Sequence, residues 1–306
     1  MDSLRRSGPS RAPERYSAQL LRFCREMFLV DEPEICDVHV MAFLVHCVNR
    51  PVVRDERGQL VEGPLRNGLS TLVEALSVYY RCVGISPITK RVRRFAAALR
   101  EQYGRPPRLA EPLTLEGVRD FISAMNRRPL GLRNKAVLLL LCETWCRPGE
   151  LLALDYPGCV RGSGDGIVVT FAHCKADCGE PHFVPVAHAR DPDLCPICAL
   201  KVWIDYLGPG YVGPLFPSLR QGRPRPASLS TSGVTSMLRS LAKKSGRNPD
   251  TYSSYSTRRG SATIAASEGW ELSAIQRKLW HAHVGQTLHY IGIDALMGRT
   301  RSVLDP

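Results

Sequence analysis

Apolar residues recur at intervals of three and four along most of this chain, which is the spacing that places them on one face of a helix. In the first third the periodic positions begin at Tyr16 and predict helices near residues 16–28, 35–48, 69–83 and 86–103. Ser86-Pro87 introduces the last of these as an N-cap followed by a favoured first-turn proline. Because no strand pattern occurs before residue 160, this third is predicted to be helical.

The remaining two thirds predict further helices and one region of strands. Thr114 suits an N-cap for a helix with Leu115, Val118, Phe121 and Ile122 on its apolar face. A buried central helix is predicted over Asn134–Trp145. Gly166–His173 and Pro181–Val186 predict the two strands of a hairpin, and two more helices are predicted over Pro196–Leu207 and Ser230–Ser245. Residues 219–229 are rich in proline and glycine and predict a loop. The fold class is therefore mainly α with a small antiparallel β-hairpin, an α+β protein.

Changes in composition divide the chain. Residues 1–15 are rich in Arg, Pro and Ser and predict a disordered basic leader. A helical domain is expected over residues 16–105, a Pro-containing linker over 106–111, and a second domain over 112–306.

The overall composition favours a polyanionic partner. The 306 residues carry a net charge of +12 and the pI is about 9.4, a balance typical of nucleic-acid-binding proteins. The longest apolar run, Ala136–Cys142, is much shorter than the roughly 20 residues that span a bilayer, and no apolar signal core is present. Eleven scattered cysteines do not resemble a small disulfide scaffold, so an intracellular, reducing compartment is expected.

Basic residues concentrate in two segments. Residues 81–108 contain eight basic residues against one acid, and residues 219–249 contain seven basic residues and no acid. Contact with DNA phosphates is expected, with a merely solvated face as the alternative. The residues expected to bind DNA are Arg91, Arg93, Arg94, Arg223, Arg225, Lys243 and Lys244.

Candidate chemistry concentrates in the segment Tyr255–Tyr290, where Arg258, His281 and Tyr290 occur among short helices. A phosphodiester suits this set of side chains, because Arg binds two of its oxygens, His donates a hydrogen bond and a tyrosine hydroxyl can attack. Earlier, Arg147 and Glu150 follow the buried helix at once, where an unpaired charge would be costly. A local ion pair capping two helices is the alternative explanation.

The spacing of these residues resembles that of the tyrosine recombinases over roughly residues 112–292. Arg258, His281 and Tyr290 stand 23 and then 9 residues apart, like the family's second arginine, third-box histidine and nucleophile. Arg147 with Glu150 resembles the first box, and Lys175 resembles the hairpin lysine. Cys195-Pro-Ile-Cys198 is similar to eukaryotic mobile-element or viral versions.

The resemblance implies a site-specific recombinase or integrase that works through a covalent 3′-phosphotyrosyl intermediate, without cofactor, metal or ATP. It implies that Tyr290 attacks, that Arg147 and Arg258 clamp the phosphate, that Lys175 protonates the leaving oxygen and that His281 hydrogen-bonds the phosphate. Glu150 would orient a neighbour. Double-stranded DNA and a homotetramer on DNA are the implied partners, no membrane is involved, and a eukaryotic host would place the protein in the nucleus.

Three positions depart from the family pattern. Tyr255 stands where a histidine is usual, and Trp145 and Trp280 stand where glycines are usual. A phenol is a poor base near neutral pH because its pKa is about 10. Two alternatives therefore stay open: a non-catalytic DNA-binding descendant of the fold, and a nicking-closing enzyme like the type IB topoisomerases.

A zinc site is a further alternative interpretation of the cysteines. Cys174, Cys178, His182, Cys195 and Cys198 lie close in sequence, and Cys-x-x-Cys is a zinc-ligand spacing. The partner spacing matches no zinc motif, so ordinary buried thiols are expected instead, and no metal ligand is assigned.

Overall fold

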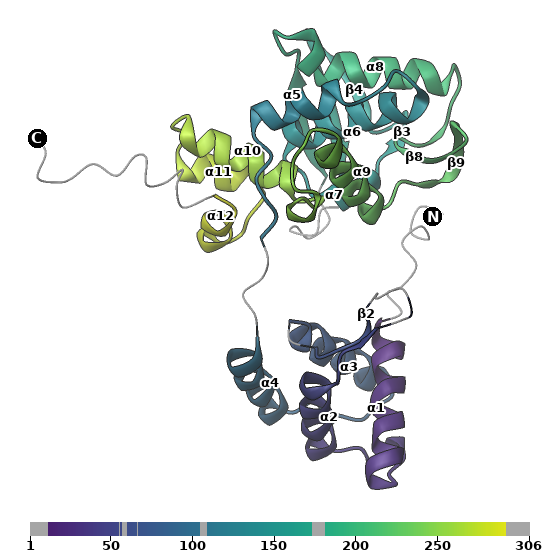
Figure 1. The fold of residues 1–306 in the computed structure, drawn as a ribbon, viewed down its shortest axis with the longest axis vertical. Helices are drawn as coiled ribbons and strands as arrows, with labels where there is room; N and C mark the ends of the chain where they lie inside the picture. The colour runs from purple at the N-terminus through teal and green to yellow at the C-terminus, as the bar shows by residue number, and fades with distance from the viewer. Residues whose placement is uncertain are drawn as a thin grey trace, which may run out of the picture. The chain divides into compact units, whose positions relative to one another are not determined.

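A computed structural model of the chain describes residues 12–54, 56, 60–65, 67–104, 109–172 and 181–291. The chain divides into two compact units, Met1–Arg108 and Leu109–Pro306 (Figure 1). Both units are mostly helical and the sheets are small and antiparallel, so the predicted fold class is confirmed. Within the described residues, none of the helices is both long and apolar enough to cross a bilayer.

The first unit is built from four helices that share one apolar core. Helix α1 packs on α3, and α2 packs on α4. Leu20, Phe43, Leu72 and Leu76 are completely buried between them. The helices are α1 (Ala12–Phe28), α2 (Asp37–Asn49), α3 (Leu69–Cys82) and α4 (Lys90–Tyr103), with a 3-10 turn η2 (Glu32–Glu34) between the first two.

Three details of this unit differ from the sequence prediction. Helix α1 begins at Ala12, so residues 12–15 are helical rather than part of a disordered leader, while residues 1–11 lie outside the described residues. Two short strands, β1 (Val53–Arg54) and β2 (Leu60–Glu62), pair in an antiparallel hairpin that is too short to give an alternating pattern. The N-cap of α4 is Thr89, whose Oγ1 accepts a hydrogen bond from Val92 N at 3.3 Å, and not Ser86.

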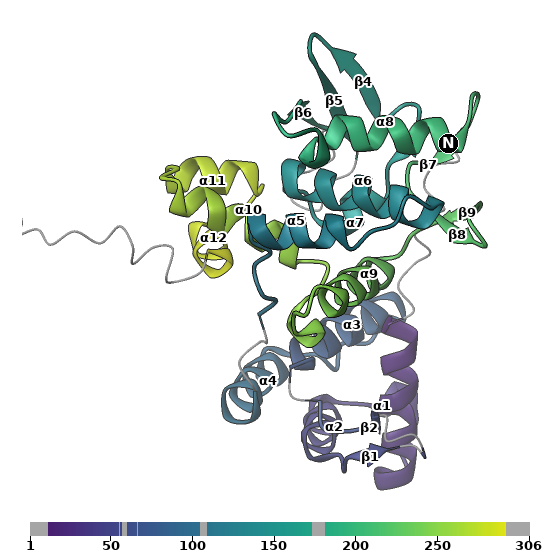
Figure 2. The same cartoon turned by 45° about the horizontal axis from the view of Figure 1, so that its top comes forward.

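The second unit is organised around the buried helix α6. As predicted, this helix is apolar on nearly all sides, and α8, α10 and strand β6 pack against it. Figures 1 and 2 both show α8 beside α6. The predicted N-cap Thr114 accepts a hydrogen bond from Gly117 N at 3.1 Å. The helices before the C-terminal segment are α5 (Leu115–Ser123), α6 (Pro129–Thr144), α7 (Pro148–Leu152), α8 (Pro196–Leu207) and α9 (Thr231–Lys244), with 3-10 turns η3 (Pro192–Leu194) and η4 (Pro249–Thr251).

The predicted hairpin is present and carries a third strand. Strands β4 (Val160–Ser163), β5 (Gly166–Phe171) and β6 (His182–Ala187) form an antiparallel sheet in the order β4-β5-β6. A second hairpin, β8 (Pro217–Arg220) with β9 (Arg223–Ser228), occupies a segment whose composition predicts a loop. Prolines are compatible with this hairpin because both strands of a two-stranded sheet are edges. A final pair joins β3 (Asp155–Tyr156) to β7 (Gly213–Pro214), so short strands do begin before residue 160.

Three short helices complete the second unit and hold the candidate chemistry. They are α10 (Ser256–Ser267), α11 (Leu272–Lys278) and α12 (Val284–Tyr290). A small apolar cluster holds them together and includes Trp145, Ala262, Ile275, Leu279 and Ile291. This cluster attaches the C-terminal segment to the end of α6, because Trp145 is the residue that caps that helix.

Gly260 allows α10 to approach the chain at Leu113 closely. A Cβ at position 260 would fall far inside van der Waals contact with the carbonyl of Leu113. We therefore expect Gly260→Ala to lower the free energy of unfolding by about 3 kcal/mol, because backbone must move. Gly162→Ala is the control, since nothing lies within 4 Å of the corresponding Cβ. Urea denaturation of both variants measures the difference, and equal stability would mean that α10 is not tightly held.

Candidate active site

Arg147 and Glu150 form an interlocked pair at the start of α7. Glu150 Oε2 accepts from Arg147 N at 2.7 Å, and Glu150 Oε1 accepts from Arg147 Nη1 at 2.9 Å. The Glu150 side chain is 7% exposed and that of Arg147 is 24% exposed. The pair therefore caps α7, in agreement with the alternative explanation of a local ion pair. It also leaves part of the Arg147 guanidinium available to a ligand.

Arg258 lies on α10 with none of its surface exposed. Nη1 donates to the carbonyl of Trp145 and Nη2 donates to the carbonyl of Leu279. Burial is the largest cause that lowers the pKa of this guanidinium, and the positive charge of Arg147 lowers it further. One buried cation thus joins the end of α6 to the end of α11.

His281 lies beside Arg258 and is 8% exposed. Nε2 is 3.2 Å from Arg258 Nη2, and Nδ1 is 3.1 Å from Thr287 Oγ1. Because a guanidinium can only donate, Nε2 must accept, which places the ring proton on Nδ1. Burial, with help from Arg258 and Arg147, lowers the pKa of His281 to about 4, so the imidazole is neutral at pH 7.

Tyr290 ends α12 and faces these residues. Its ring centroid is 5.6 Å from Arg258 Cζ and 5.0 Å from the His281 ring. Burial raises the pKa of the phenol above its ordinary value, while the charge of Arg258 opposes that shift. A pocket of about 450 Å³ is lined by Arg147, His281, Gly285, Gln286, His289 and Tyr290. The structure therefore brings Arg147, Arg258, His281 and Tyr290 together from four segments of one chain.

Arg259 is a residue that the sequence pattern does not single out. It is 9% exposed, its Nε donates to the carbonyl of Tyr290 at 3.3 Å, and its Nη1 donates to the carbonyl of Ala110. This side chain therefore fixes the backbone of the tyrosine against the start of the second unit. Its adjacency to Arg258 is the only signal in the sequence, and a pair of arginines does not indicate what the second one binds.

Two other expected residues are placed differently. Lys175 lies outside the described residues. Tyr255 directly precedes α10 and is 43% exposed. It lies near enough to Tyr290 to add to the upward shift of that residue's pKa.

Both tryptophans at usual glycine positions adopt left-handed backbone. The φ angles are 56° at Trp145 and 50° at Trp280, a conformation that costs a non-glycine residue about 1–3 kcal/mol. Trp145 stacks on Trp270 at 5.8 Å, and Lys278 Nζ lies 5.0 Å from its ring. Trp280 contacts Phe171 and His182 at the ends of β5 and β6. These contacts offset the backbone cost and connect the turns to neighbouring elements.

The expected DNA-binding residues lie on the surface of α4, β9 and α9. Arg223, Arg225, Lys243 and Lys244 are exposed. On α4, Arg94 is exposed, whereas Arg91 lies 3.8 Å from Asp37 and Arg93 pairs with Glu74 at 3.1 Å. Acids thus neutralise part of the α4 cluster, while the cluster on β9 and α9 presents its charges openly.

Residues 111–296 match the model of the phage integrase family. The chain belongs to the phage integrase family. It is 27% identical over 240 residues to an integrase/recombinase XerD homolog from Selenomonas ruminantium, covering 76% of this chain and 70% of that protein. It is 29% identical over 192 residues to the tyrosine recombinase XerD of Halalkalibacterium halodurans, covering 60% and 57%.

Solved structures share the fold of this family member. The integrase of transposon Tn1549 in complex with transposon right end DNA has a TM-score of 0.59 at 15% identity, covering 96% of this chain and 94% of that chain. A lambda integrase tetramer bound to a Holliday junction has a TM-score of 0.57 at 17% identity, covering 95% and 74%. The resemblance to tyrosine recombinases is thereby confirmed, and the protein is a DNA recombinase of that family. The narrower eukaryotic or viral type stays a prediction.

The depressed pKa of His281 makes the stability of this integrase-family protein depend on pH. The folded pKa is about 4 against 6.5 in a reference imidazole, so the unfolded chain binds the proton first as the pH falls. Stability is therefore lost as the pH falls below about 6.5, and this histidine contributes about 2 kcal/mol of loss by pH 5.

We expect His281→Asn to remove that part of the loss, measured by urea denaturation at pH 7.5 and pH 5. His283→Asn, a substitution of an exposed histidine in the same segment, serves as the control and should keep the loss of the parent protein. An unchanged pH dependence in His281→Asn would show that the imidazole is not held neutral.

Proposed function

We propose that this protein is a site-specific DNA recombinase or integrase that cleaves and rejoins strands through a covalent bond between Tyr290 and a 3′-phosphate. The observation that supports the proposal best is the convergence of Arg147, Arg258, His281 and Tyr290 in one small region, three of them lining a single pocket. Two cations, an imidazole and a phenol suit a phosphodiester better than any other common group.

The chemistry assigned to each residue follows from its charge and contacts. Tyr290 Oη attacks phosphorus and gives its proton to water as the bond to the 5′-oxygen breaks; Lys175 protonates that oxygen and takes a proton back from water afterwards. Arg147 and Arg258 offset the charge that grows on the non-bridging oxygens. Within the described residues no group accepts from Arg258 Nε, so this buried N–H stays available to an acceptor. The bound anion would also raise the pKa of His281, because it opposes the two cations that lower it, and the imidazolium could then donate to the phosphate.

The roles of Lys175, Tyr255 and Glu150 complete the proposal. Lys175 would protonate the departing 5′-oxygen, as its resemblance to the family's hairpin lysine implies. Tyr255 would hydrogen-bond the phosphate in place of the usual histidine. Glu150 orients Arg147 through the two hydrogen bonds described above.

Neither metal nor ATP is required in this scheme. The phosphotyrosyl bond retains the energy of the phosphodiester, so a strand's free 5′-hydroxyl can reverse the attack, and a new strand can replace the old one. Two guanidinium groups supply the charge neutralisation that a metal ion provides in other phosphoryl transfers. Because Tyr290 lies beside the arginines of its own chain, the proposal includes cleavage within one protomer.

Binding of duplex DNA is assigned to the basic surfaces, and assembly to a tetramer. The helical first unit, with α4, would act as a core-binding domain while β9 and α9 contact backbone phosphates from the second unit. A lambda integrase, whose fold this chain shares, forms a tetramer on a Holliday junction. In a eukaryotic host these partners would require the protein to enter the nucleus.

A covalent-adduct experiment tests the chemistry with a randomised substrate, so that no target sequence has to be chosen. A pool of nicked duplexes randomised around the nick is incubated with protein, and DNA that stays attached in detergent is recovered and sequenced. We expect a phosphotyrosine at Tyr290 by mass spectrometry and loss of the adduct in Tyr290→Phe. Tyr206→Phe, which changes a 38% exposed tyrosine of α8, should retain it. DNA binding without any adduct in the parent protein would support the non-catalytic descendant instead.

The same substrates test the phosphate clamp. Arg147→Ala should lower the cleavage rate at least about 100-fold, with little change in DNA binding. Arg258→Ala should have the same effect on the cleavage rate. Arg258→Lys is measured beside it, because lysine retains a buried positive charge and disturbs folding less. Strand exchange between two labelled duplexes distinguishes a recombinase from a nicking-closing enzyme, which would only relax supercoiled DNA.

The open basic surface predicts a steep salt dependence of DNA affinity. The double variant Lys243→Ala/Lys244→Ala should reduce the slope of log K against log salt by about 2, because each lost phosphate contact removes roughly 0.9. Lys135→Ala is a control that removes one positive charge at a lysine that already pairs with Asp193 at 2.9 Å, and it should change the slope little. Fluorescence anisotropy over a salt series gives both slopes, and identical slopes would show that α9 faces solvent in the complex.

A further inference from the structure

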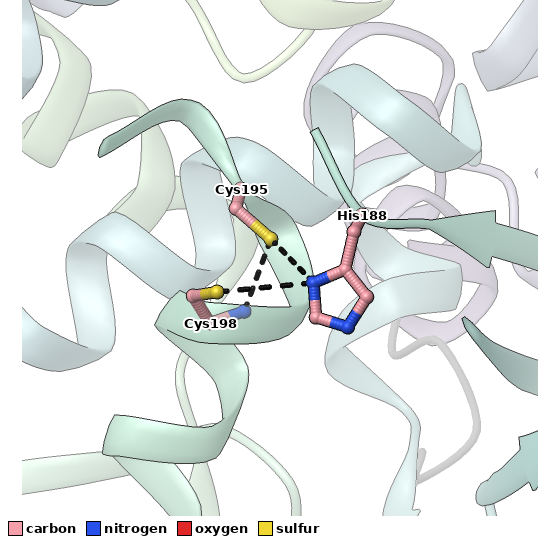
Figure 3. A group of neighbouring side chains, drawn as sticks. All are labelled: His188, Cys195 and Cys198. Atoms are coloured by element: carbon pink, nitrogen blue, oxygen red, sulfur yellow. Dashed lines mark hydrogen bonds between the residues drawn. The ribbon is translucent and has the colours of Figure 1, made fainter. Parts of the chain in front are cut away.

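His188, Cys195 and Cys198 form a cluster of metal-ligating atoms outside the proposed catalytic pocket. Figure 3 shows the imidazole pointing toward both sulfur atoms. Nδ1 of His188 is 3.2 Å from Cys195 Sγ and 3.9 Å from Cys198 Sγ, and all three atoms lie within 4.8 Å of one another. The sequence pattern indicates the two cysteines but not His188, since the histidine lies seven residues before them in no recognised motif spacing.

The fold brings the three residues together at one end of α8. His188 directly follows strand β6, Cys195 is the N-cap of α8, and Cys198 lies in its first turn. The N–H of Cys198 donates to Cys195 Sγ at 3.4 Å, so the turn of the helix points a backbone dipole at the sulfur. Cys195 is buried, whereas His188 and Cys198 reach the surface, which gives an ion a route of entry.

These distances fit a tetrahedral zinc ion. With Zn–S near 2.3 Å and Zn–N near 2.0–2.1 Å, tetrahedral ligand atoms lie about 3.5–3.8 Å apart. The two nitrogen–sulfur separations of 3.2 and 3.9 Å bracket the nitrogen–sulfur value, and the two sulfur atoms lie within 4.8 Å of each other, so shifts of the ligand atoms by at most about 1 Å would form the tetrahedron. Two thiols with one imidazole are also the soft and borderline ligands that zinc prefers.

We propose that His188, Cys195 and Cys198 bind a zinc ion through three protein ligands, with water completing the tetrahedron. The ion would fasten the end of β6 to the start of α8 and close the turn η3 between them. None of its ligands lines the pocket at Tyr290, so the site would stabilise the fold rather than take part in strand cleavage. The proposal departs from the expectation that no residue binds a metal. His182, which the sequence also suggested as a ligand, contacts Trp280 instead.

A Cys–His pair in the first unit resembles this cluster but has fewer ligands. Cys36 Sγ lies 3.5 Å from His39 Nδ1, and that pair supplies two ligands rather than three. Cys82 is exposed and free, so it reports on non-specific metal uptake by a surface thiol. These positions provide controls within the same chain.

Metal content and cobalt spectra of the full chain test the proposal. The protein is purified without a histidine tag under reducing conditions, and zinc is measured by mass spectrometry. We expect about one zinc per chain in the parent, in Cys82→Ser, in Cys36→Ser and in Tyr290→Phe, and almost none in Cys198→Ser or His188→Asn. Cobalt(II) added to the chelator-treated parent protein should give the intense visible bands of a tetrahedral thiolate site.

Two further measurements separate loss of metal binding from loss of folding. Cys198→His replaces one ligand by another and should retain metal, which separates loss of ligation from loss of folding. A chelator should lower the Tm of the parent protein by several degrees and leave that of Cys198→Ser unchanged. The proposal fails if the parent takes up neither zinc nor cobalt, if Cys36→Ser or Cys82→Ser loses metal as Cys198→Ser does, or if Cys195 and Cys198 are found joined as a disulfide under these conditions.

Discussion

The arrangement of the C-terminal helices of the second unit depends on the burial of Arg258. Arg258 has no exposed surface, and its guanidinium is held by the carbonyls of Trp145 and Leu279 and by His281. A charge without such partners would cost several kcal/mol to bury, so both carbonyls must point inward. That requirement sets the conformation of two turns that are far apart in the sequence, and it determines which protonation state His281 can adopt.

The two left-handed tryptophans lie where helices end, Trp145 at the end of α6 and Trp280 just after the end of α11. A residue with positive φ is common at such a position, and glycine adopts it without strain. This chain uses tryptophan at both positions and obtains packing in exchange. Trp145 stacks with Trp270, and Trp280 contacts the ends of β5 and β6. The substitutions therefore preserve the backbone and add contacts between segments, without removing a charged group from the site.

Sequence reasoning succeeds where local physics decides the structure. Thr114 caps α5 as its side-chain chemistry predicts, and the apolar stretch after Asn134 is the buried α6. It fails where distant contacts decide. The prolines of β9 indicate a loop because nothing local shows that β8 lies alongside, and Ser86-Pro87 resembles a helix start as closely as Thr89 does, since both suit a cap.

The functional residues also divide into those that sequence spacing indicates and those that only tertiary contacts reveal. Arg147, Arg258, His281 and Tyr290 could be selected because their spacing along the chain resembles a family pattern. Arg259 and His188 could not, because each acts through tertiary contacts with residues that the sequence does not connect to them: Ala110 and Tyr290 for the arginine, and two cysteines across the turn η3 for the histidine.

The zero exposure of Arg258 has a consequence for the protein away from DNA. With the ring of Tyr290 beside it, the guanidinium offers no surface to inorganic phosphate, nucleotides or stray strand ends in the cell. Arg258 is therefore screened from small anions, whereas Arg147, whose side chain is 24% exposed, is the cation that the pocket presents to them.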